Sequence, residues 1–103
     1  MKLTRSREFR ADRAWGAVPV QAFGDVTVKV HWTDQPYRWH INSGAEVFAV
    51  LDGVVEMRYR VDGDERTVRL ETGDVLAIAE GEEHVAHPIG EARILVVERA
   101  DSD

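Results

Sequence analysis

From Gly16 onward, apolar and polar residues alternate with a period of two rather than 3.6, and this periodicity predicts strands rather than helices. Residues 25–32, DVTVKVHW, are the clearest case, since Val28, Val30 and Trp32 share one face while His31 lies on the other. We expect the valine and tryptophan face to be buried and His31 to point away from the core. The runs are short and about eight in number, so an all-β fold without helices is expected.

Turn residues separate these runs. Asp62-Gly63 lies between two alternating segments, which is a strong hairpin signal. Residues 45–53 and 92–98 are apolar on both faces, as in a strand held between two layers or at a subunit contact. Many short strands in 103 residues predict a small barrel or jelly roll that limits exposed edges. We expect one barrel domain over residues 16–100, preceded by a basic N-terminal arm over residues 1–15.

Charge and composition exclude several classes of function. The net charge of −6 argues against nucleic-acid binding, which needs a basic surface. No apolar run is long enough for a membrane span, and the first fifteen residues lack the apolar core of a signal peptide, so a cytoplasmic protein is expected. The chain has no cysteine, which excludes disulfides, thiolate zinc sites and a cysteine nucleophile.

Residue types that bind metals fall in two stretches, residues 39–53 and 73–88. His40 and Asn42 are two apart, so on a strand they share a face, and Glu46 can resume that face after the intervening turn. His84 follows a tight polar turn and offers a third ligand. A histidine next to a carboxylate suits a first-row metal, or a general base with its orienting partner.

The spacing of these residues resembles the two motifs of the cupins, G-x5-H-x-H-x3-4-E-x6-G and G-x5-P-x-G-x2-H-x3-N. Three of five positions match in each motif, and the resemblance covers residues 34–88. The matching residues are His40, Glu46 and Gly53 in the first motif and Gly73, Gly81 and His84 in the second. The departures are Asp34 for the first glycine, Asn42 for the second histidine, Ala79 for the proline and Pro88 for the asparagine.

The resemblance implies a double-stranded β-helix, the jelly-roll cupin barrel, with a divalent metal ion in its mouth. Carried over by position, His40, Glu46 and His84 are metal ligands, and Asn42 occupies the fourth ligand position. An amide oxygen is a weaker ligand than imidazole, so Asn42 either binds weakly or leaves that position to water. The metal would be zinc, iron, nickel or manganese, and the alternative is a cupin pocket without metal.

Aromatic and apolar residues near the expected barrel mouth indicate a pocket for a small, partly apolar organic ligand. The candidates are Tyr37, Trp39, Phe48 and Met57, with His87 at the pocket rim. For Phe48 and Met57, an ordinary place in the core is the alternative interpretation.

These residues leave three hypotheses open. One is a metal-dependent oxygenase or isomerase of a small organic compound, and another is a non-catalytic cupin that binds or senses a small molecule. The third is a scaffolding or storage protein with an occluded barrel. A homodimer is also expected, because Val47, Ala49 and Leu51 form a second apolar face that a small barrel cannot cover by itself.

Overall fold

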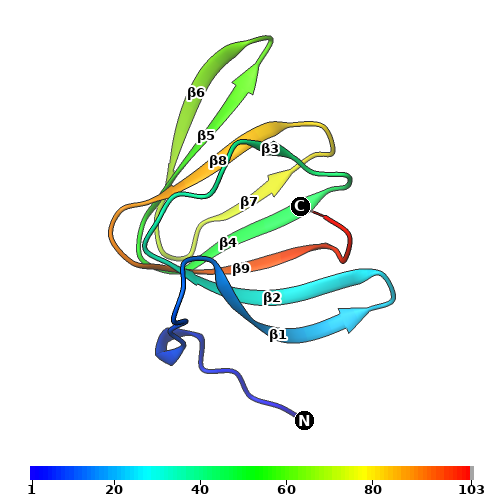
Figure 1. Cartoon of the computed structure of the whole chain (residues 1–103), viewed down its shortest axis with the longest axis vertical. Coiled ribbons are helices and arrows are strands. Elements are labelled where there is room, and N and C mark those ends of the chain that lie inside the picture. The colour runs from blue at the N-terminus through cyan, green and yellow to red at the C-terminus, as the bar shows by residue number, and fades with distance from the viewer. Residues whose placement is uncertain (103) are drawn as a thin grey trace.

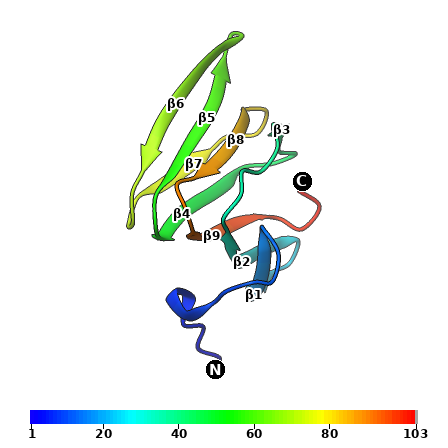
Figure 2. The ribbon, with the colours of Figure 1, turned by 60° about the vertical axis from the view of Figure 1, so that its left-hand side comes forward.

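The computed structural model describes residues 1–102, which form two antiparallel sheets that face each other (Figures 1 and 2). The five-stranded sheet has the order β1(Gly16–Phe23), β2(Val26–Thr33), β9(Ala92–Arg99), β4(Glu46–Asp52) and β7(Val75–Ile78). The four-stranded sheet has the order β3(His40–Ile41), β8(Glu83–Pro88), β5(Val55–Val61) and β6(Asp64–Leu70). Outside the strands, the described chain contains one 3-10 turn, η1(Ser6–Glu8), and no α-helix. The predicted all-β jelly roll is confirmed.

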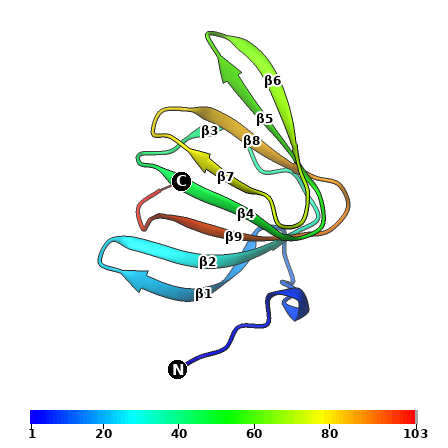
Figure 3. The ribbon, with the colours of Figure 1, turned by 180° about the vertical axis from the view of Figure 1, so that it is seen from behind.

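Asp62 and Gly63 form the predicted hairpin turn. Both have positive φ, 51° and 84°, which matches the twist of two strands joined by a two-residue turn. Val61 then pairs with Asp64, and β5 and β6 remain in register as far as Val55 and Leu70. This hairpin projects beyond the rest of the molecule in Figures 1 and 3.

The turn between β4 and β5 requires the glycine at position 53. Gly53 has a φ of +95°, and a Cβ added there would lie 2.5 Å from the carbonyl oxygen of Glu91. A side chain would therefore meet both backbone strain and a clash with the turn before β9. Gly53 lets the chain cross between the sheets at the end of the strand that begins with Glu46.

The core lies between the two sheets. Phe48, Val50 and Ile94 contribute from the five-stranded sheet, and Val55 and Met57 from the four-stranded sheet. Each of these side chains is at most 3% exposed. The core fills the interior beside the site described below.

The prediction for β2 is confirmed for the apolar face, since Val30 and Trp32 are buried, but it is wrong for His31. His31 pairs with Ile94, a fully buried core residue, so His31 faces the space between the sheets. Val28, Val30 and Trp32 lie on the outer face, where the N-terminal arm crosses part of the sheet. The guanidinium of Arg10 lies 5.3 Å from the centroid of the Trp32 ring. The outer face is apolar because other parts of the chain cover some of it, not because it belongs to the central core.

The N-terminal arm is packed on the barrel. Arg93 donates a hydrogen bond from Nε to the carbonyl oxygen of Phe9 at 2.7 Å, and Lys2 donates one to the carbonyl oxygen of Pro19 at 3.0 Å. The arm ends at Trp15, whose φ of 61° is unusual for a residue other than glycine, and β1 begins at the next residue. Within residues 1–102, no helix has the length and apolar character needed to cross a membrane.

Candidate metal centre and cavity

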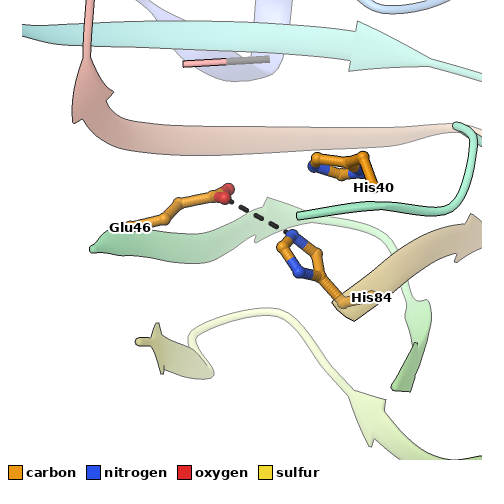
Figure 4. A group of neighbouring side chains, drawn as sticks. All are labelled: His40, Glu46 and His84. Carbon is orange, nitrogen blue, oxygen red and sulfur yellow. Dashed lines mark ion pairs between the residues drawn. The ribbon is translucent and has the colours of Figure 1, made fainter. Parts of the chain in front are cut away.

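Three side chains from three strands converge near one end of the barrel (Figure 4). His40 comes from β3, Glu46 from β4 and His84 from β8, and their potential ligand atoms all lie within 4.8 Å of one another. His40 is the pairing partner of His84, and the centroids of the two rings are 4.3 Å apart. Glu46 reaches them from the opposite sheet, with its Oε1 3.6 Å from Nε2 of His84. We refer to these three residues as the donor cluster.

Backbone carbonyl groups fix the proton position on both histidines. Nδ1 of His40 lies 2.9 Å from the carbonyl oxygen of Arg38, and Nδ1 of His84 lies 2.8 Å from that of Glu82. A carbonyl oxygen can only accept a hydrogen bond, so each Nδ1 carries the hydrogen and each neutral ring keeps the lone pair of Nε2. Metal-binding histidines are commonly oriented by such a bond from their second ring nitrogen.

The carboxylate and one imidazole of the donor cluster are deeply buried. Glu46 is 6% exposed and His84 is 3% exposed. Burial acts to lower the pKa of His84, but the neighbouring Glu46 carboxylate and the Glu82 carbonyl oppose it, so the pKa is raised above its ordinary value of 6.5. The buried negative charge of Glu46 thus favours a positive charge beside it, whether a proton on His84 or a metal ion.

Asn42 is beside the donor cluster but is turned toward Glu46. It is 2% exposed, and its Nδ2 donates a hydrogen bond to Oε1 of Glu46. Its Oδ1 is buried and has no hydrogen-bond partner among the described residues. This arrangement makes Asn42 a group that positions the carboxylate, while leaving one buried oxygen atom available for a partner.

The chemistry of the donor cluster fits a divalent first-row metal ion. Two imidazole nitrogen atoms and one carboxylate are the donor set of the two-histidine, one-carboxylate facial triad. The unpartnered Oδ1 of Asn42 is a further oxygen donor close to the same carboxylate. Three protein ligands leave coordination positions free for a substrate or water.

A cavity of about 200 Å³ opens beside the donor cluster. Of the residues that the sequence placed in a ligand pocket, Tyr37, Phe48 and Met57 line this cavity. Trp39 lies elsewhere, with the guanidinium of Arg60 3.7 Å from its ring centroid. His87 also lies outside the cavity lining and is paired with Glu56 on β5.

Trp15 and His31 are among the cavity residues that were not anticipated from the sequence. The alternation along β2 puts His31 on the face opposite the outer apolar face. That was the sequence signal from which its position between the sheets could have been predicted. Trp15 comes from the arm, where no periodic pattern predicts a position. The motif spacing thus identifies the donor cluster, whereas the places of Trp15 and His31 in the cavity emerge only from the structure.

Comparisons with known proteins agree with this architecture. The model of the Cupin domain family matches residues 24–98. A cupin-2 domain containing protein from Shewanella frigidimarina is 23% identical, with a TM-score of 0.76, over 86% of this chain and 84% of that chain. No curated protein matches the chain by sequence.

Two dioxygenase structures share the fold over part of their length. Hydroquinone 1,2-dioxygenase from Sphingomonas sp. TTNP3 with 4-hydroxybenzoate bound is 20% identical, with a TM-score of 0.78 over 89% of this chain and 29% of that chain. A hydroquinone 1,2-dioxygenase in complex with Fe³⁺ is 19% identical, with a TM-score of 0.77 over 88% of this chain and 29% of that chain. At these identities the likeness concerns the fold.

Proposed function

The chain belongs to the cupin family, and on that premise we propose that it binds a divalent metal ion through His40, Glu46 and His84 and holds a small organic ligand in the adjoining cavity. The observation that carries the proposal is the convergence of two oriented Nε2 atoms and a buried carboxylate within 4.8 Å. Among zinc, iron, nickel and manganese, this donor set favours iron, because two histidines and one carboxylate are typical of non-heme Fe(II) oxygenases.

The reaction that best suits the site is oxygenation of a small hydroxylated compound by dioxygen. A bound iron ion would supply Lewis acidity and redox chemistry at the donor cluster. The chain itself contributes an apolar cavity: Phe48 and Met57 exclude water from one side, and Tyr37 packs edge-on against His40 with ring centroids 5.0 Å apart. The two dioxygenases of the same fold support this choice of reaction class.

The test is oxygen uptake by the full chain after anaerobic loading with Fe(II), using a panel of small phenols and diphenols. We expect uptake that depends on both iron and substrate. Glu46→Gln should abolish it, because the carboxylate ligand is lost, while His87→Ala, outside the cavity, should retain it.

Other outcomes separate the alternatives. A protein that binds iron and a phenol but consumes no dioxygen would contradict the oxygenase and favour an isomerase or a binding and sensing role. A protein that binds no divalent metal would contradict the whole proposal.

The proposal includes a homodimer formed through the outer face of the five-stranded sheet. Strand pairing places Val28, Val97, Val47 and Ala77 in one row across this face. Val47 is 36% exposed and Val75, in the next row, is 67% exposed. Burying such a surface against a second copy would remove it from water. Light scattering should give the mass of a dimer for the wild type and of a monomer for Val47→Lys; a monomeric wild type would contradict the dimer.

A further inference from the structure

The cavity has a polar residue besides the donor cluster. His31 lies on β2 and lines the cavity, but it is not one of the three residues whose ligand atoms converge. Its Nδ1 lies 3.1 Å from the carbonyl oxygen of Trp15. Because that oxygen can only accept, Nδ1 carries the hydrogen, and Nε2 keeps its lone pair as an acceptor.

His31 is neutral near pH 7. Burial is the largest influence on its pKa and lowers it, and the nearby Lys29 acts in the same direction. The hydrogen bond to Trp15 and the negative charge of Glu46 oppose this, but the pKa remains below its ordinary value of 6.5. The imidazole therefore offers a neutral acceptor to the cavity, which suits a hydroxyl donor and disfavours a carboxylate or carbonyl oxygen at that point.

Trp15 holds this arrangement in place. Its backbone has a φ of 61°, a strained conformation of the kind that persists where the surrounding structure enforces it. Its indole Nε1 donates a hydrogen bond of 3.0 Å to the carbonyl oxygen of Gln35. The same indole lies edge-on to Tyr37, with ring centroids 5.2 Å apart, and lines the cavity. The end of the N-terminal arm thus supplies both an aromatic wall and the carbonyl group that orients His31.

We propose that Trp15 and His31 complete the ligand site, with Nε2 of His31 accepting a hydrogen bond from a hydroxyl group of a small aromatic ligand. The other polar end of the ligand lies at the donor cluster, and its ring packs between Trp15 and the apolar side chains of the cavity. The volume of about 200 Å³ limits the ligand to roughly a single ring with its substituents. This inference rests on the proposed function and adds a specificity-determining residue to it.

The experiment compares two probes, phenol and hydroquinone, in binding to the full chain loaded with zinc, which excludes turnover. Wild-type protein should bind hydroquinone about five- to tenfold more tightly than phenol, because the second hydroxyl group reaches His31. In His31→Phe the ratio should fall to about twofold, the statistical factor for a symmetrical diphenol, with phenol affinity retained. His87→Ala, outside the cavity, should keep the wild-type ratio.

A measurement on the wild type covers the case in which His31→Phe does not fold. The ¹⁵N resonance of the unprotonated His31 nitrogen should shift on addition of hydroquinone and not of phenol. Equal binding of the two probes, failure of both to bind, or a preference unchanged in His31→Phe would overturn the role of His31. Zinc content is measured separately, because a protein without zinc contradicts the proposed function, whereas in zinc-loaded protein the ratio of the two affinities decides the role of His31.

Discussion

Replacing Asn42 with alanine should weaken metal binding while leaving the fold almost unchanged. The side chain donates one hydrogen bond to the Glu46 carboxylate and carries one buried oxygen without a partner. A hydrogen bond to a charged group contributes about 1.5–3 kcal/mol, and an unsatisfied buried polar atom costs about 1–3 kcal/mol. Asn42→Ala removes both, so the two effects partly offset each other and the free energy of unfolding should change by no more than about 2 kcal/mol.

The assay has two readouts on the same variant. For a domain of this size, 1 kcal/mol corresponds to about 4–8 °C in Tm, so the metal-free variant should melt within about 16 °C of the wild type. Loss of a group that orients a metal ligand typically weakens metal affinity by about 10- to 100-fold, and titration with Zn(II) should show a change in that range. Asn42→Asp is the contrasting variant, because a second carboxylate beside Glu46 should destabilise the metal-free protein further.

Two results would contradict this role of Asn42. If Asn42→Ala loses metal as completely as His40→Ala, Asn42 is itself a ligand rather than a positioning group. If its metal affinity equals that of the wild type, the hydrogen bond to Glu46 does not orient the carboxylate.

Two further predictions concern stability. Because the pKa of His84 is raised in the folded chain above its ordinary value of 6.5, its stabilising contribution should be fully present below that pH and lost as the pH rises through the raised pKa. The Tm difference between metal-free wild type and His84→Gln should therefore be larger at pH 5.5 than at pH 8.5, and an equal or reversed difference would contradict it. Gly53→Ala should lower the free energy of unfolding by more than Gly63→Ala in a urea titration. Both glycines have positive φ, but only at Gly53 would the added Cβ lie 2.5 Å from a backbone oxygen, so equal losses would contradict that contact.

The fold was predictable because its signals are local. Alternation with a period of two marks the strands, and Asp62-Gly63 can adopt positive φ at both positions of a tight turn. The donor cluster was predictable from motif spacing, although His84 is far along the chain from His40. The pairing of β3 with β8 closes that separation.

The faces of β2 and the part played by Asn42 could not be predicted in the same way. Alternation divides β2 into two faces, but the packing of the arm and the second sheet decides which face is interior. The position of Asn42 in the motif suggested a ligand, whereas the orientation of its amide depends on where Glu46 lies in the folded chain. Trp15 is the last residue of the arm and itself has the positive φ that accompanies its place in the cavity lining. Nothing in its neighbouring sequence indicates that conformation.

The proposed function requires His40, Glu46 and His84 to hold a metal ion. Its most direct test is the metal content per chain, by plasma mass spectrometry, of untagged protein purified without chelator. The wild type should contain a divalent first-row metal, with iron foremost, at close to one ion per chain, and His40→Ala and His84→Ala should both lose it while His87→Ala keeps it. A wild type that holds no metal even after incubation with Fe(II) or Zn(II), or variants of the donor cluster that retain it, would contradict the claim.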